Sequence, residues 1–177
     1  MLFQGSFTIH PGTYKAVLTI VDRKSHRGAS RAETIVPPEF SGGLSLSTIV
    51  VGRLPEGPRE GAASGRPGAA SLVPDPQAVF LPGETVTFAY QVYNARLKGG
   101  APDLHVEYRF LIELEGGSRQ AGKPVVLPHL TSESLAYSLV LQGWPEAAYR
   151  VRVQVTDNRS GASAEREESF RIAARPD

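Results

Sequence analysis

The four histidines of this sequence are the side chains best suited to bind a transition metal, and they are spread along the chain. Imidazole is a common zinc ligand, and zinc ligands usually occur as closely spaced pairs. No histidine lies two or four residues from another, so the spacing favours exposed positions in strands or turns. We therefore predict no metal site from this set, which consists of His10, His26, His105 and His129.

Two aspartates, Asp22 and Asp157, offer carboxylate oxygens of the kind that calcium prefers. Calcium takes about six to eight oxygen ligands. The local sequences Asp-Arg-Lys-Ser and Asp-Asn-Arg-Ser supply few carboxylates and place cations beside them. An aspartate at the start of a turn can instead accept hydrogen bonds from backbone amides. We predict that both aspartates cap turns.

Residues for covalent or acid–base catalysis form no recognisable pattern. The chain has no cysteine, which excludes thiolate catalysis, cysteine-ligated zinc and disulfides. It has no Gly-x-Ser-x-Gly elbow and no glycine-rich phosphate loop leading into a helix. Carboxylates do cluster, but on alternating outer faces or strand edges where solvation explains them: Glu113 with Glu115, and Glu165 with Glu167 and Glu168. The sequence predicts a protein that is not an enzyme and holds no cofactor.

One aromatic residue is a candidate contact for a ligand or a partner. Trp144 is the only tryptophan and precedes a proline in a predicted turn. With Tyr137 or Tyr93 it could form a platform for a sugar ring, since aromatic side chains combine an apolar face with a polar group. The alternative, which we favour, is that Trp144 packs over the end of the domain.

Composition excludes several other classes of partner. Nineteen basic and eighteen acidic residues leave a formal charge of +1, which does not direct the protein to nucleic acid or to an anionic membrane. No apolar run approaches the roughly 18 residues of a membrane-spanning helix. Hydrophobic residues make up 41% of the chain, enough for a packed core.

A repeated pattern organises the chain. From Pro145 to Asp157 the sequence alternates with period two, so that Tyr149 and the valines that follow it share one face of a strand. Residues 11–22 repeat this pattern, and in both copies the aspartate follows the tyrosine by eight residues. A tyrosine two residues before a core position is typical of the corner of an immunoglobulin-like sandwich. We predict that Tyr149 and Tyr14 are corner tyrosines.

Residues 44–177 are predicted to form a complete immunoglobulin-like domain, an antiparallel Greek-key β-sandwich. The segments at 44–51, 78–81, 85–94, 104–114, 123–127, 135–141, 145–157 and 164–172 read as strands separated by turns. Residues 52–77, which are rich in Gly, Pro, Ala and Ser, interrupt this series. We predict a flexible loop there.

Residues 1–43 are predicted to be a partial β unit and a linker. Segments 7–21 and 29–36 read as a hairpin, which is too small to bury a core of its own. It is either the last hairpin of an upstream immunoglobulin-like domain or an element that completes a sheet elsewhere. Residues 1–6 contain Leu-Phe-Gln-Gly, the core of a viral 3C protease site used in expression vectors, and fit a native strand equally well.

Three motifs carry a resemblance to a known family. They are Phe80-Leu-Pro-Gly-Glu-Thr-Val-Thr-Phe-Ala-Tyr90-Gln-Val-Tyr-Asn-Ala95, Gly99-Gly-Ala-Pro-Asp-Leu104 and the strand from Tyr149 to Asp157. Most of residues 37–172 thereby resembles the C-terminal region of acidobacterial von Willebrand factor A-related proteins and of GWxTD-domain proteins. The resemblance implies a sandwich module and a secreted or periplasmic parent, and no active site. The Asp-x-Ser-x-Ser adhesion motif is absent, and the insertion at 52–77 departs from the family pattern.

These observations lead to one expected function and two alternatives. We expect a non-catalytic binding or spacer module of a larger bacterial secreted, periplasmic or surface protein, acting through protein–protein contacts. The first alternative is a structural assembly subunit, in which the N-terminal hairpin pairs with a neighbouring copy by strand addition. The second is a carbohydrate-binding module that uses Trp144.

Overall fold

Strands account for all of the repetitive secondary structure in the computed structural model, which describes residues 9, 12–37, 39–40, 42–54 and 72–174. This confirms the prediction of an all-β fold. The physical reason is that period-two alternation places apolar side chains on one face of each strand. Among the described residues, no helix could cross a membrane. Residues 1–6, His10 and most of the predicted loop lie outside the described part.

The chain divides into two compact units, Met1–Ser41 and Gly42–Asp177. The first contains the antiparallel hairpin of β1 (Tyr14–Val21) and β2 (Gly28–Ile35). Its register runs from the pair Tyr14 and Ile35 to the pair Val21 and Gly28. Pro37 follows β2 and cannot donate a backbone hydrogen bond to extend the pairing.

One sheet of the second unit contains the strands with the strongest alternation. Its order is β10 (Val125–Leu130), β8 (Leu104–Leu114), β12 (Ala147–Asp157), β13 (Ser163–Ile172) and β6 (Val79–Phe80). In addition, β9 (Gly117–Gln120) pairs with the end of β8. The pairing of β13 with β6 is parallel and the others are antiparallel.

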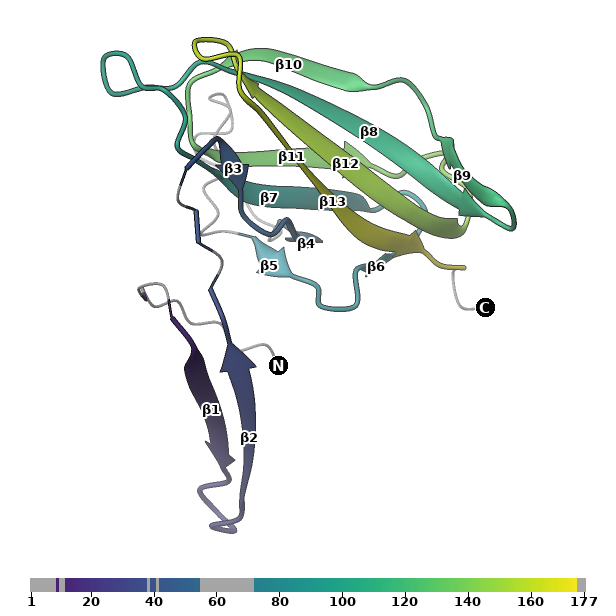
Figure 1. The fold of residues 1–177 in the computed structure, drawn as a ribbon. Coiled ribbons are helices and arrows are strands. Elements are labelled where there is room, and N and C mark those ends of the chain that lie inside the picture. The colour runs from purple at the N-terminus through teal and green to yellow at the C-terminus, as the bar shows by residue number, and fades with distance from the viewer. Residues whose placement is uncertain (1–8, 10–11, 38, 41, 55–71, 175–177) are drawn as a thin grey trace. The chain divides into compact units, whose positions relative to one another are not determined.

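The second sheet has the order β11 (Ser134–Val140), β7 (Thr85–Tyr93), β4 (Val50–Arg53) and β5 (Val73–Pro74), with β3 (Ser45–Leu46) also paired to β7. Figure 1 shows the two sheets as facing layers, as in a β-sandwich. The predicted strand at 44–51 is in fact two strands, β3 and β4. The predicted loop at 52–77 is wrong at both ends, where residues of β4 and β5 pair with each other.

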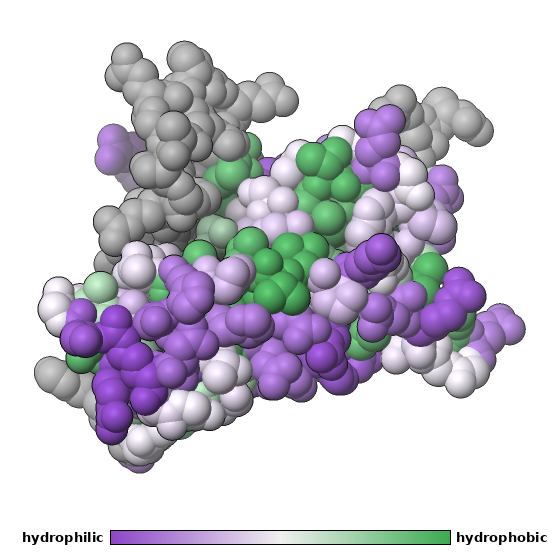
Figure 2. All heavy atoms as spheres, turned by 90° about the horizontal axis from the view of Figure 1, so that it is seen from above, coloured by the Kyte–Doolittle hydropathy of each residue, from purple (hydrophilic) through white to green (hydrophobic). Residues whose placement is uncertain are grey.

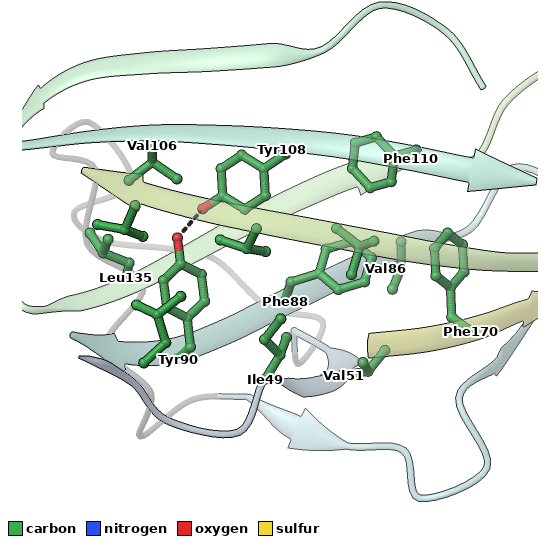
Figure 3. Packing of buried hydrophobic residues seen from close by; sticks show 14 of the residues in the cluster. Ile49, Val51, Val86, Phe88, Tyr90, Val106, Tyr108, Phe110, Leu135 and Phe170 are labelled. Carbon is green, nitrogen blue, oxygen red and sulfur yellow. Dashed lines mark hydrogen bonds between the residues drawn. The ribbon is translucent and has the colours of Figure 1, made fainter. Parts of the chain in front are cut away.

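The core lies between the two sheets and is built from the predicted inward faces (Figure 3). On one side it takes alternate residues of β8 and β12, and on the other those of β7: Leu104, Val106, Tyr108, Phe110, Tyr149, Val151, Val153, Val155, Val86, Phe88, Tyr90 and Val92. A hydrogen bond of 2.8 Å joins the Tyr90 and Tyr108 hydroxyls across the sheets. Burial raises the pKa of Tyr108 to about 12, so this pair stays protonated in ordinary buffers.

Candidate functional site

The histidines that the structure describes do not converge. No group of three His, Asp or Glu side chains suitable for a metal occurs in the described part of the chain. His129 Nδ1 lies 3.0 Å from Asp103 Oδ1, and Asn158 Nδ2 donates to the same oxygen at 2.8 Å. These two hydrogen bonds, that of Asn158 first, lower the pKa of Asp103. These contacts tie β10 and the turn after β12 to Asp103, which lies just before β8.

Three of the clustered carboxylates, Glu113, Glu165 and Glu167, form ion pairs with arginines on the outer face of β8, β12 and β13. Arg150 lies 3.0 Å from Glu113 and 3.2 Å from Glu167, and Arg152 lies 2.6 Å from Glu167. The hydrogen bond from Arg152 is the main cause of the lowered pKa of Glu167. A carboxyl group held ionised in this way is a poor general acid. Figure 2 shows hydrophilic residues over much of the visible surface, with hydrophobic residues in smaller groups between them.

Trp144 packs against the core. Its ring makes edge contacts with Phe110 at 5.4 Å and with Tyr149 at 5.2 Å, measured between ring centroids. Tyr137, one of the two expected platform partners, stacks on Tyr108 at 4.6 Å. Trp144 therefore has a packing role whether or not it also contacts a ligand.

Tyr149 and Asp157 hold the two ends of β12. The Tyr149 hydroxyl donates to the carbonyl oxygen of Pro145 at 2.8 Å, four residues earlier. Asp157 accepts from the amide of Arg159 at 2.9 Å, the hydroxyl of Ser160 at 2.6 Å and the amide of Arg96 at 2.9 Å. Burial acts to raise the pKa of Asp157, but these hydrogen bonds to the ionised form outweigh it and the pKa is lowered.

The turn between β1 and β2 has the same hydrogen bonds as the turn between β12 and β13. Asp22 accepts from the amide of Lys24 at 2.9 Å and from the hydroxyl of Ser25 at 2.7 Å. These hydrogen bonds, that from Ser25 first, lower the pKa of Asp22. Backbone bonds from Asp22 to Arg27 and from His26 to Asp22 close the turn, at 2.8 and 2.9 Å. In the second turn, Asp157 bonds to Ala162 and Gly161 to Asp157 at 2.9 and 2.8 Å.

The two turns also each contain one residue in the left-handed conformation, at the same position. His26 has φ 56° and Gly161 has φ 73°, at the same position after the aspartate. Glycine adopts this conformation without strain, whereas histidine does so at a cost. Two turns that differ at this residue but keep the same hydrogen bonds are copies of one local structure.

The strands on either side of the two turns also pair in the same register. Tyr14 faces Ile35 as Tyr149 faces Phe170, with 135 positions between each equivalent pair. Sequence reasoning found the repeat in the first strand and missed it in the second. There, three residues recur at the same offset: Ala29, Arg31 and Glu33 correspond to Ala164, Arg166 and Glu168. Comparing the chain with itself at this offset would have found them.

The two hairpins differ in how exposed their equivalent side chains are. Val153 and Val155 of β12 are 0% exposed, whereas their counterparts in β1, Leu18 and Ile20, are 65% and 58% exposed. The opposite face of β1 also exposes valines, at Val17 and Val21. An exposed apolar surface of this kind is a candidate interaction site. We call the side of the hairpin with Tyr14, Ala16, Leu18, Ile20 and Ile35 the hairpin face.

The hairpin face is thus the candidate functional site, because it exposes large apolar side chains. Its apolar side chains suit another protein surface, because their transfer from water is favourable by about 25 cal/mol per Å². No protein-family model matches this chain, and no curated protein matches it.

Proposed function

We propose that the chain is a non-catalytic binding or spacer module of a larger bacterial secreted or envelope protein, and that it acts through protein–protein contacts. The observation that carries this proposal is the hairpin face, on which Leu18 and Ile20 are more than half exposed. The second unit supports it as a scaffold, since His129, Trp144, Glu113, Glu165 and Glu167 are engaged in hydrogen bonds, ion pairs or ring contacts. The resemblance stated from the sequence accords with a secreted or periplasmic parent.

Photo-crosslinking in the bacterium that carries the gene tests this function. A photoreactive amino acid replaces Val17 on the hairpin, and in a matched control it replaces Arg152 on the charged outer face of β12. We expect protein adducts from the Val17 position and few from the Arg152 position. Equal adduct formation at the two positions, or none at Val17, would contradict the proposal.

Assembly of the chain with itself is a second candidate, and the outer edge of β1 favours it. β1 pairs only with β2 among the described strands, so its other edge presents backbone groups that a neighbouring chain can pair with. Light scattering over a range of concentrations would compare the whole chain with a chain that starts at Gly42. Association of the whole chain alone is the expected result. Monomers in both cases would exclude this candidate.

A further inference from the structure

We propose that β1 and β2 are the closing hairpin of a second sandwich-like unit, and that their partner is a β-sandwich that lacks this hairpin. The partner supplies one strand to the edge of β1 that no described strand pairs with, and a facing sheet to the hairpin face. This inference rests on the proposed function, because it names the kind of protein that the hairpin contacts. It is argued from what surrounds the equivalent hairpin, β12–β13.

β12 pairs with β13 along one edge and with β8 along the other. The second edge corresponds to the edge of β1 opposite β2. The pairing with β8 is antiparallel and places Val153 opposite Tyr108 and Val151 opposite Phe110. Since β1 repeats the register and turn of β12, Leu18 takes the position of Val153 and Ala16 that of Val151. The partner strand therefore runs antiparallel to β1 and, like β8, carries apolar residues at alternate positions.

The face of β12–β13 is covered by the opposite sheet. Phe88 of β7 contacts the ring of Phe170 at 5.4 Å between centroids. Phe170 is the counterpart of Ile35, which belongs to the hairpin face. A large apolar residue of the partner's second sheet is thus expected over Ile35, and the partner must provide two layers instead of a single strand.

A polar contact supports the presence of that second layer. Arg166 of β13 donates from Nε to the carbonyl oxygen of Leu46, in the opposite sheet, at 3.3 Å. Its counterpart Arg31 stands in the same phase of β2 and forms an exposed ion pair with Glu33 at 2.6 Å. Arg31 is therefore placed to donate to a backbone carbonyl of the partner.

Among the described strands, only β2 pairs with β1, so the partner strand is not one of them. The second unit of another copy cannot supply this place, because β12 already lies beside β8 there. The occupant is a β-sandwich in which the place of β12–β13 is empty.

Grafting the hairpin into the second unit of the whole chain tests the proposal. The segments Tyr14–Ile35 and Tyr149–Phe170 each contain 22 residues, so the first can replace the second without a change of length. In the graft, the smaller Ala16 replaces Val151. The larger Leu18 and Ile20 replace Val153 and Val155. Because the size changes partly offset one another, the core should still pack.

The matched control is the same graft moved by one residue, with residues 13–34 in the same 22 positions. This shift turns Lys15 and Thr19 toward the core and moves the turn out of place. Amide hydrogen exchange across Leu104–Leu114 and thermal unfolding by circular dichroism are measured for both. We expect slow exchange and one cooperative transition for the first graft, and fast exchange for the control. Exchange in the first graft as fast as in the control would overturn the inference.

The graft and the crosslinking experiment fail independently. Crosslinks from the Val17 position with an unfolded graft would leave the hairpin as a protein contact but refute a sandwich partner of this kind. A folded graft without crosslinks would support the structural assignment of the hairpin and refute the proposed protein-contact function.

Discussion

The two hairpins of this chain have the same turn, the same register and the same alternation, yet the apolar residues of one are buried in a core and those of the other are exposed. In β12 the inward residues are almost wholly inaccessible to solvent, and in β1 their counterparts are mostly exposed. The hydrogen bonds of the turn are kept in both copies. Local structure here depends on the sequence of the hairpin, whereas the energetic role of each side chain depends on what covers it.

The outer faces of the hairpins differ in a second way. In β12–β13 this face carries the ladder of Arg150 and Arg152 with Glu165 and Glu167. The positions that correspond to Arg152 and Glu167 hold Val17 and Ala32 in the first hairpin. A charged face suits solvent, so the hairpin that lacks the ladder is less suited to remain exposed on both sides.

Substitution of a charged residue at equivalent positions should give the largest contrast between the two hairpins. Val153→Asp buries an unpaired carboxylate at a site that is 0% exposed. We expect the free energy of unfolding of the second unit to fall by about 4 kcal/mol or more. Leu18→Asp should change it by less than about 0.5 kcal/mol, because Leu18 is exposed. Urea unfolding followed by circular dichroism measures both. Equal losses would show that β1 is covered in the chain alone.

Removal of the turn caps should give the next largest contrast. Asp157→Ala deprives the buried end of β12 of three hydrogen bonds, one of which fixes the loop at Arg96. We expect a loss of about 2–3 kcal/mol, because the three bonds are made to an ionised carboxylate that is only 1% exposed. Asp22→Ala removes the same local bonds in an exposed turn, where water replaces them. Thermal unfolding should therefore respond to the first variant far more than to the second, and a reversed order would contradict this.

Most of the second unit could be predicted from the sequence, because its strands have strict alternation. The segment 104–114 coincides with β8, and the inward residues of β12 are the predicted ones. Two short strands were missed. β9 begins at a glycine of the Gly116-Gly117 pair, which reads as a turn, and β5 is a two-residue strand in a segment rich in Pro and Gly.

Contacts that join distant parts of the chain could not be predicted. Arg53 makes an ion pair with Asp75, lies 3.0 Å from Glu84, and donates to the carbonyl oxygen of Val79 at 2.7 Å. A Cβ atom at Gly52 would lie 2.2 Å from the carbonyl oxygen of Val73. No periodicity reports such contacts, because they depend on how β4, β5 and the segment after β5 come together in space.

The candidate site was predictable in part for the same reason. The pattern around Tyr14 and Asp22 is local and could be read directly. What the hairpin lacks could be inferred only once the pairing of β12 with β8 was known. Trp144 was a weaker prediction, because a lone aromatic residue in a turn has no period that would distinguish packing from binding.

Lowering the pH should weaken the hydrogen bonds of both aspartate caps, with a larger loss of stability at Asp157 than at Asp22. The pKa of Asp157 in the folded chain is lowered below its ordinary value of 3.8, so the ionised group stabilises the fold above that value. This stabilisation is lost as the pH falls through the lowered pKa, and Asp157→Asn should remove that part of the pH dependence. This pH dependence is measured by thermal unfolding between about pH 5 and pH 2, a range that spans the pKa of a carboxyl group. An unchanged pH profile in Asp157→Asn would contradict the assignment.

Substitutions at the left-handed residues of the two turns should give the smallest effects, of opposite sign. Gly161→Ala places a side chain at φ 73° and should destabilise the second unit by about 1 kcal/mol. His26→Gly relieves the same strain at φ 56° and should slow hydrogen exchange at the amides that close the β1–β2 turn. If the hairpins are copies of one local structure, a glycine is favoured at this position in both. A turn in the first hairpin that loosens with His26→Gly would show that the histidine side chain has a role of its own there.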